Sequence, residues 1–339
     1  YGGTVTDQLN TIVPTSDGGY LLGGYSTSNA NGNKTRNSFG FSDYWVVKID
    51  ANGTKQWDSI YGGSLGEELN TIISTKDGGY LLGGFSASGL ATGNKTRASF
   101  GQEDYWVVKI NANGVKQWDS IYGGTNEDLL RNILPTADGG YLLGGTSISN
   151  SSGNKTRNSY GSYDYWVVKI NANGTKQWDS IYGGTNSEDL KVIISTSDGG
   201  YMFCGSSNSL ASGNKTRSTF GSYDYWIVKI NANGSKQWDS IYGGANLDYS
   251  YSVVSANDGS YLIGGYSSSA VSGNKTTTSF GSNDYWLVKI DANGTRLNEK
   301  GYGGTSIDNP YSIIATKDGG YLIGGYSQSG ITGNKTTSS

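Results

Sequence analysis

Short runs of apolar residues alternate with clusters of Gly, Asn and Asp along the whole chain, which is the pattern of β-strands joined by tight turns. In one stretch the apolar runs are residues 69–75, 80–86, 104–110 and 116–121. Asp-Gly-Gly separates the first two runs and Asn-Ala-Asn-Gly separates the last two, and both sequences favour tight turns. The pattern therefore predicts four antiparallel strands in a unit of about 60 residues.

This unit recurs from one end of the chain to the other, and Tyr-Gly-Gly opens each copy. The repeats are residues 1–60, 61–121, 122–181, 182–241, 242–301 and 302–339, of which the last is partial. Small sheets of this kind cannot cover their own apolar faces, so neighbouring copies are expected to pack on one another. We predict one all-β domain over 1–339, a β-propeller of four-stranded antiparallel blades, with six blades expected and the last incomplete.

The composition of the strands predicts their order within a blade. The second and third strands are apolar on both faces, as strands between two neighbouring sheets should be. The first strand carries Pro14 and Pro135, and proline is confined to edge strands because it has no N–H to donate. The fourth strand, residues 116–121, is polar around one Trp. We therefore expect the first strand at the inner edge and the fourth at the outer edge.

Composition removes several classes of site. The chain has no His and a single Cys, so disulfides, the common zinc sites and Ser-His or Cys-His hydrolytic arrangements are not available. Cys204 is expected to be a small buried residue. The net charge of −3 indicates no nucleic-acid partner, and no apolar stretch is long enough for membrane insertion. We predict no metal and no cofactor.

Two sequences carry a resemblance to known repeats. A Gly-Tyr-Leu-Leu-Gly-Gly strand is followed by a hairpin that reads Tyr-Trp-Val-Val-Lys-Ile-Asn-Ala-Asn-Gly-Thr-Lys-Gln-Trp in residues 165–178. This resembles the quinoprotein-type propeller repeat, and more closely the repeats of secreted or cell-surface propeller proteins of Bacteroidota. The resemblance implies a location outside the outer membrane and, as for many such proteins, export by type IX secretion.

The two hairpins do not occur equally often. Asp-Gly-Gly/Ser-Tyr occurs six times, from Asp17 to Tyr321, whereas Asp-Tyr-Trp occurs five times, at Asp43, Asp104, Asp164, Asp224 and Asp284. Because a propeller normally completes its last blade, we expect the natural polypeptide to continue beyond Ser339. A sorting domain there would make the secretion machinery a partner.

The long loop between the second and third strands holds the candidate ligand-binding residues. The first four copies each carry a Lys, an Arg and an aromatic residue, which together could stack on a sugar ring and donate charged hydrogen bonds to it. Thr277 and Thr337 replace the Arg in the last two copies. The residues are Lys34, Arg36, Phe39, Lys95, Arg97, Phe100, Lys155, Arg157, Tyr160, Lys215, Arg217 and Phe220. The alternative is structural: the charges keep the surface soluble and the aromatic residue holds the loop to its blade.

Two further patterns recur, the first in all five complete repeats and the second in the first four. The Asp before Tyr-Trp could cap backbone N–H groups or coordinate a cation, and we expect capping because no second acidic residue keeps a fixed spacing from it. Asp-Ser-Ile in the fourth strand resembles an O-glycosylation sequon of Bacteroidota, and an ordinary edge-strand pattern is the alternative. The candidate acceptors are Ser59, Ser120, Ser180 and Ser240.

Since every conspicuous polar position is repeated, the sequence favours a repeated surface over a single asymmetric catalytic site. We predict a non-catalytic, secreted or cell-surface propeller that serves as an adhesion, scaffold or glycan-binding module, with glycans or other cell-surface proteins as partners. One alternative is a propeller enzyme, quinoprotein-like or glycosidase-like. The other is a passive repeat segment or cargo of a larger type IX-secreted surface protein.

Overall fold

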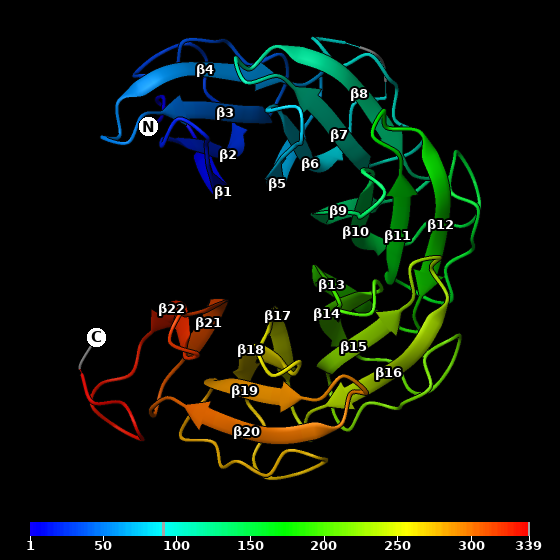
Figure 1. Cartoon of the computed structure of the whole chain (residues 1–339), viewed down its shortest axis with the longest axis vertical. Coiled ribbons are helices and arrows are strands. Elements are labelled where there is room, and N and C mark those ends of the chain that lie inside the picture. The colour runs from blue at the N-terminus through cyan, green and yellow to red at the C-terminus, as the bar shows by residue number, and fades with distance from the viewer. Residues whose placement is uncertain (90–91, 338–339) are drawn as a thin grey trace. The chain divides into compact units, whose positions relative to one another are not determined.

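The computed structural model describes residues 1–89 and 92–337 of the chain, and strands joined by turns and loops make up its secondary structure (Figure 1). The strands are β1 (Asp7–Pro14), β2 (Tyr20–Ser26), β3 (Asp43–Ile49), β4 (Lys55–Tyr61), β5 (Glu67–Ser74), β6 (Tyr80–Ser86), β7 (Asp104–Ile110), β8 (Lys116–Tyr122), β9 (Asp128–Pro135), β10 (Tyr141–Ser147), β11 (Asp164–Ile170), β12 (Lys176–Tyr182), β13 (Glu188–Ser195), β14 (Tyr201–Ser207), β15 (Asp224–Ile230), β16 (Lys236–Tyr242), β17 (Asp248–Ser255), β18 (Tyr261–Ser267), β19 (Asp284–Ile290), β20 (Arg296–Tyr302), β21 (Asp308–Ala315) and β22 (Tyr321–Ser327). Within the described ranges no helix has the length and apolar character needed to cross a membrane.

The strands pair in sequence order as antiparallel sheets. Five sheets have four strands each, with the order β1-β2-β3-β4 repeated in every complete copy, and β21 and β22 pair as a two-stranded sheet. Four antiparallel strands per repeat are the content of a propeller blade, so the predicted all-β propeller fold is confirmed.

Contacts group the chain into two compact units, residues 1–159 with 166–181 and residues 160–165 with 182–339. The first unit holds the sheets that begin with β1, β5 and β9, and the second holds those that begin with β13, β17 and β21. Asp164, Tyr165 and Tyr182 belong to the second unit although their strands lie mostly in the first. Whether the whole chain is one domain, as we predicted, stays a prediction.

Within a unit, consecutive sheets pack face to face around a core of strand residues. Leu82, Trp106 and Val108 of the second sheet belong to the same buried cluster as Tyr44 and Val46 of the first. This is why the second and third strands are apolar on both faces. The first strands of neighbouring sheets contact one another, as β1, β5 and β9 do, and the fourth strands lie at the other edge of each sheet (Figure 1).

The Tyr-Trp pair of the third strand joins one sheet to the next. The Tyr44 ring centroid lies 4.7 Å from that of Trp106, and the Tyr44 hydroxyl donates a 2.9 Å hydrogen bond to the Trp106 carbonyl oxygen. Tyr105 makes the same contacts with Trp166. A buried ring pair with a satisfied hydroxyl explains why Asp-Tyr-Trp recurs in each complete repeat.

The prolines and the cysteine occupy the predicted positions. Pro14 and Pro135 end β1 and β9, which are edge strands of their sheets, and Pro310 lies in the edge strand β21. Cys204 is fully buried in β14, and burial raises the pKa of its thiol to about 12. The thiol is therefore not available for redox or nucleophilic chemistry in the folded chain.

The two short turns of a repeat lie at the same end of its sheet. Lys109, at the end of β7, has its Nζ 2.9 Å from a carboxylate oxygen of Asp77 in the Asp-Gly-Gly turn and 2.9 Å from Gln117 Oε1 in β8. Hydrogen bonds from Thr75 and Lys109 lower the pKa of Asp77 to about 2. The long loops between second and third strands therefore lie at the opposite end.

Candidate functional site

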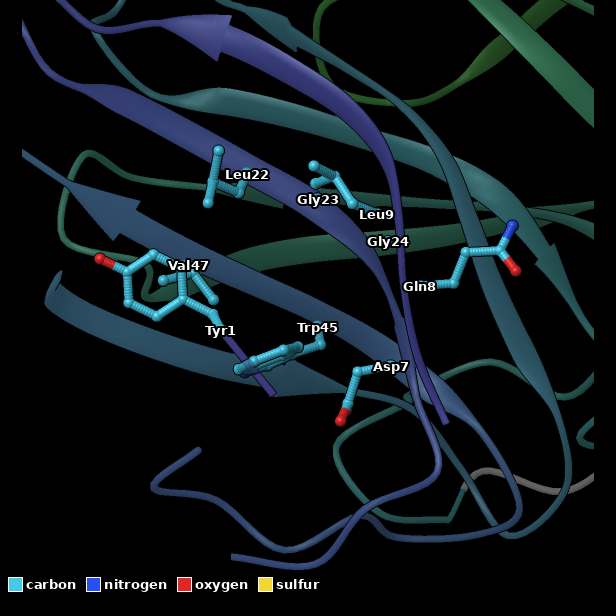
Figure 2. A pocket seen from close by; sticks show the side chains of 9 residues that line it. All are labelled: Tyr1, Asp7, Gln8, Leu9, Leu22, Gly23, Gly24, Trp45 and Val47. Carbon is cyan, nitrogen blue, oxygen red and sulfur yellow. The ribbon is translucent and has the colours of Figure 1, made fainter. Parts of the chain in front are cut away.

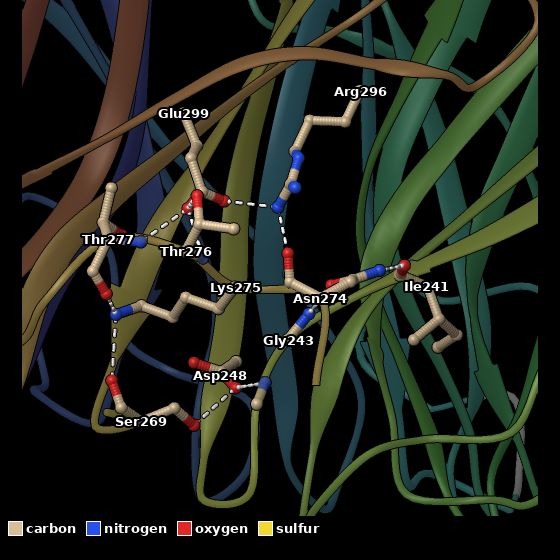
Figure 3. A network of polar contacts seen from close by, with 11 residues as sticks. Ile241, Gly243, Asp248, Ser269, Asn274, Lys275, Thr276, Thr277, Arg296 and Glu299 are labelled. Carbon is tan, nitrogen blue, oxygen red and sulfur yellow. Dashed lines mark hydrogen bonds and ion pairs between the residues drawn. The ribbon is translucent and has the colours of Figure 1, made fainter. Parts of the chain in front are cut away.

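The Gly-Asn-Lys-Thr part of each long loop is tied into the structure from inside. In the fifth repeat Asn274 donates a 2.8 Å hydrogen bond to the Ile241 carbonyl of the preceding sheet (Figure 3). Lys275 turns inward and donates to the carbonyl oxygens of Ser269 at 2.9 Å and Thr277 at 2.7 Å. These polar side chains satisfy backbone groups that the irregular loop would otherwise leave unpaired.

The lysines that we predicted to bind ligands have the same inward position. Lys34, Lys95, Lys155 and Lys215 are each 2% or 3% exposed. Burial lowers the pKa of Lys95 and of Lys215 to about 8. For these four residues the prediction of a surface ligand contact was wrong, because their ammonium groups hold the loop from within.

The arginines and aromatic residues of the same loops do reach the surface. Phe100 and Phe220 are 46% and 47% exposed, and the four loop arginines are exposed as well. The exposed residues of this set are Arg36, Phe39, Arg97, Phe100, Arg157, Tyr160, Arg217 and Phe220. The loop lysine recurs in all six copies and the arginine in the first four, but both are charged residues of one loop, and the sequence pattern did not separate the buried type from the exposed one.

Each aromatic residue also contacts the loop of the next repeat. Phe100 lies against Gly153, so closely that a β-carbon at Gly153 would be 2.7 Å from Phe100 Cγ. Gly153 has a φ of +56°, which glycine adopts without strain. The aromatic residue thus holds neighbouring loops together with one face, as the structural alternative proposed, and keeps about half of its surface exposed.

Two equivalent cavities lie beside these residues, one in each unit. The first has a volume of about 410 Å³ and is lined by Arg97, Phe100, Ser120 and Lys176 among others. The second has a volume of about 440 Å³ and is lined by Arg217, Phe220, Ser240 and Arg296 among others. We call these two cavities the rim pockets. Each is formed by the loop and fourth strand of one repeat and by the following repeat.

The two positive side chains of a rim pocket differ in what holds them. Arg296 has its Nη1 2.8 Å from a carboxylate oxygen of Glu299 and also donates to the Asn274 carbonyl (Figure 3). Lys176 is likewise 2.7 Å from Asp179. Arg97 and Arg217 have no ion pair with any carboxylate in the described part of the chain. Each pocket therefore presents one guanidinium whose charge is not neutralised by a neighbour.

The Asp of the Asp-Ser-Ile triplet has a structural role. Asp119 is buried, and its carboxylate accepts hydrogen bonds from Thr96 N at 3.0 Å, Trp106 Nε1 at 3.1 Å and Lys116 Nζ at 2.8 Å. A buried acceptor of several hydrogen bonds is reason enough for this residue to recur. The following serines, including Ser120 in a rim pocket, are half-buried. Their O-glycosylation stays a prediction.

The Asp before Tyr-Trp caps its own loop, as we expected. Asp43 is fully buried, and its Oδ2 accepts the backbone N–H of Phe39 at 2.7 Å. The expectation that it has no acidic neighbour at a fixed spacing was wrong. A second carboxyl follows each of these residues at the same spacing along the chain. The pairs are Asp43 with Glu67, Asp104 with Asp128, Asp164 with Glu188, Asp224 with Asp248, and Asp284 with Asp308.

The carboxyl groups of a pair converge on the glycine of the intervening Tyr-Gly-Gly. A β-carbon at Gly123 would lie 1.6 Å from Asp104 Oδ1 and 2.9 Å from Asp128 Oδ2. Asp104 Oδ1 is buried and finds no hydrogen-bond donor among the described residues. Burial, with the neighbouring Asp128 carboxyl adding to it, raises the pKa of Asp104 to about 7. Two carboxyl groups in such a place retain a proton between them.

These pairs are not open to a substrate. Both members of the pair Asp104 and Asp128 have 0% exposure, and backbone N–H groups and serine hydroxyls surround them. In the part of the chain that the structure describes, no group of three or more His, Cys, Asp or Glu residues could hold a metal ion.

A third cavity lies away from the loops, on the face of the first sheet. It has a volume of about 160 Å³, and Figure 2 shows Leu22, Trp45 and Val47 pointing into it with Tyr1 across from them. The residues at the same positions of the second sheet belong to the buried core. The residues of this cavity therefore correspond to residues that pack against a neighbouring sheet elsewhere in the chain. Among the described residues that line it, Asp7 is the one with a charged side chain.

Comparison with known proteins identifies the fold and no family. No family model matches the chain, and no curated protein matches it. Hydrazine synthase of Kuenenia stuttgartiensis is similar over 95% of this chain and 76% of its own, with 15% identity and a TM-score of 0.50. The WD40 domain of Neurospora crassa Pan2 matches 93% of this chain and 85% of its own, with 10% identity and a TM-score of 0.47. A putative gluconolactonase matches 90% of this chain and 80% of its own, with 9% identity and a TM-score of 0.41.

At such identities the likeness to hydrazine synthase shows the propeller fold alone. Its name therefore carries no activity to this chain.

Proposed function

We propose that this chain is a non-catalytic binding module whose rim pockets recognise acidic groups on glycans, and that it acts as an adhesion or scaffold domain. The observation that carries the proposal is the combination, in two equivalent cavities, of an exposed aromatic face with an arginine that has no ion-pair partner among the described residues. A sugar carboxylate or sulfate can accept two hydrogen bonds from a guanidinium while the sugar ring packs on the aromatic side chain.

Repetition strengthens such a site more than any single contact does. One exposed charged contact adds little affinity in water, because both groups are well solvated before they meet. Two pockets on one chain can engage separate residues of one long polysaccharide, and the second contact then forms within the same complex. Polymeric acidic glycans are therefore the favoured ligands over single sugars.

A non-catalytic role is supported by what surrounds the carboxyl groups. A glycosidase needs two carboxyl groups that reach the same bond of the substrate. The carboxyl pairs of the described residues are buried where one repeat meets the next, and no Asp or Glu is among the described residues that line the two rim pockets.

The alternative of a passive spacer has its own support. In the second repeat Asn94, Lys95 and Thr96 all make internal hydrogen bonds, so these recurring polar residues need no ligand to explain them. The arginines are the exception, and the experiment below is built on them.

The test is a glycan array probed with the purified chain at several ionic strengths, followed by the double variant Arg97→Ala/Arg217→Ala. Each exposed charged contact contributes up to about 1 kcal/mol, so loss of both should weaken binding roughly tenfold. The matched control is Lys76→Ala/Lys317→Ala, which removes one exposed positive charge from each unit at the turns on the opposite end of the sheets.

We expect the array to retain acidic glycans at low salt, the arginine variant to lose them, and the lysine variant to keep them. Absence of any bound acidic glycan at every ionic strength would favour the spacer. If both double variants lost the same amount of glycan binding, the loss would follow from net charge alone, and this would contradict binding at the rim pockets.

We also propose a secreted or cell-surface location with export by type IX secretion, which rests on the resemblance of the repeats. Detection of the protein on intact cells of its source by protease treatment would test it. Complete protection from protease on intact cells would contradict it.

A further inference from the structure

Within a unit the first strands of neighbouring repeats lie side by side, and here the repeats differ from one another. The third strand keeps nearly the same sequence in the five complete copies and the fourth strand in the first four, whereas the fourth residue of the first strand changes type. At this position the chain has Asn10, Asn70, Arg131, Lys191, Tyr251 and Tyr311. The first-strand edge of the sheets is therefore the place where a site that occurs once, rather than in every repeat, can exist.

In the second unit this divergence produces a continuous group of tyrosine rings. The Tyr251 ring centroid lies 5.9 Å from Tyr249, 6.0 Å from Tyr266 and 5.4 Å from Tyr311. Tyr249 stacks on Tyr266 at 6.1 Å, and Tyr326 lies 5.8 Å from Tyr311. We call these five residues, from β17, β18, β21 and β22, the tyrosine cluster.

A lysine and an aspartate of β13 fix one side of the cluster. Lys191 Nζ lies 5.5 Å from the ring centroid of Tyr249 and 5.6 Å from that of Tyr251. The same Nζ is 2.7 Å from Asp189 Oδ2, which also accepts a 2.8 Å hydrogen bond from the Tyr249 hydroxyl. The positive charge of Lys191 is thus balanced by Asp189 within the cluster.

The other side of the cluster is open to solvent. Tyr311 is 54% exposed and Tyr326 is 38% exposed, while Tyr249, Tyr251 and Tyr266 are half-buried. Burial raises the pKa of Tyr266, so its hydroxyl stays protonated and can both donate and accept a hydrogen bond at physiological pH. The surface combines flat apolar ring faces with neutral hydroxyl groups at their edges.

We propose that the tyrosine cluster is a second, non-repeated binding site, and that it takes a neutral sugar ring of an oligosaccharide. The apolar face of a pyranose packs on an aromatic ring, and its hydroxyl groups pair with tyrosine hydroxyls without requiring a charge. This inference does not rest on the rim pockets, because it uses different residues and a different class of ligand.

The test is isothermal titration of the full chain with neutral hexasaccharides of glucose, mannose and xylose. The variant Tyr311→Ala removes the most exposed ring of the cluster, and Tyr251→Phe removes one hydroxyl while keeping its ring. The matched control is Tyr20→Ala, because Tyr20 is 43% exposed and lies in the other unit. Circular dichroism of each variant shows whether the strands are retained.

We expect at least one neutral hexasaccharide to bind the native chain, about tenfold weaker binding by Tyr311→Ala, and unchanged binding by Tyr20→Ala and by Arg97→Ala/Arg217→Ala. Absence of binding to all three hexasaccharides overturns the proposal. So does an equal loss in Tyr20→Ala, or a loss that occurs only in the arginine variant, which would assign the neutral sugar to the rim pockets. Failure of the acidic-glycan array leaves this test intact.

Discussion

Replacing Asp104 by Asn tests whether the buried carboxyl pairs retain a proton. Asn has the shape of a protonated Asp, and its carbonyl oxygen can still accept the backbone N–H of Phe100 that Asp104 Oδ2 accepts. Its amide group would then lie where Asp104 Oδ1 lies, next to Gly123 and facing Asp128, and could donate a hydrogen bond to that carboxyl. The variant therefore keeps the cap and removes only the ability to ionise.

The expected change in the free energy of unfolding follows from the pKa of Asp104, which burial raises from 3.8 to about 7. The folded chain holds a proton that the unfolded chain releases above pH 3.8. The contribution of this group to stability is thus complete below pH 3.8, and it falls as the pH rises to about 7. The loss amounts to on the order of 4 kcal/mol, opposed by the nearby positive charge of Lys95. We expect Asp104→Asn to match the native chain at pH 4 and to be more stable by up to about 4 kcal/mol at pH 8.

The assay is urea unfolding followed by tryptophan fluorescence at pH 4, 5.5, 7 and 8, with the free energy of unfolding taken from the midpoint and slope. Asp77→Asn is the control of opposite sign. Its pKa is lowered to about 2, so its contribution is present above pH 3.8 and is lost as the pH falls through 2. Because Asp77 is more than half exposed, the control should show a slight loss of stability at pH 8.

The reasoning would be refuted by an Asp104→Asn variant that is less stable than the native chain at every pH. That result would mean that both carboxyl groups are ionised in the folded chain and are held by the surrounding N–H and O–H donors. A stability difference that does not change with pH would refute it as well.

Three further changes test the packing of the repeats. Asp119→Ala should lower the free energy of unfolding by about 3–5 kcal/mol in urea, because it leaves Lys116 and the Trp106 N–H without their buried acceptor. Tyr105→Phe should cost about 1–2 kcal/mol in the same assay, since the Trp166 carbonyl loses its donor. Cys204 should resist a thiol-specific disulfide reagent in the native chain and react once urea unfolds it; rapid reaction without urea would contradict its burial.

The fold could be predicted from the sequence because each strand carries its own signal. Four apolar runs per repeat, with Asp-Gly-Gly and Asn-Ala-Asn-Gly at the expected places, determine the number and direction of strands. Pro14 and Pro135 identified the edge strand because a missing N–H is tolerated only there. Each of these signals lies within a few consecutive residues, so it can be recognised from the sequence without knowledge of the tertiary structure.

The site could be predicted only in part, because recurrence does not tell a buried side chain from an exposed one. Lys95 and Arg97 are two residues apart in one loop, yet the lysine satisfies carbonyl groups inside and the arginine reaches the surface. The pairing of Asp104 with Asp128 joins separate repeats, although their constant spacing could have indicated it. The tyrosine cluster was not predicted because its residues come from the last two repeats and are not part of the pattern that all repeats share.

Selective labelling of arginine with phenylglyoxal, read by mass spectrometry, tests the role of the rim pockets most directly. The chain would be labelled alone and in the presence of pooled acidic oligosaccharides at low salt. We predict that Arg97 and Arg217 are labelled readily in the free chain and are protected when the oligosaccharides are present, while the labelling of Arg131 in β9 does not change. Equal labelling of Arg97 and Arg217 with and without the oligosaccharides would contradict the account.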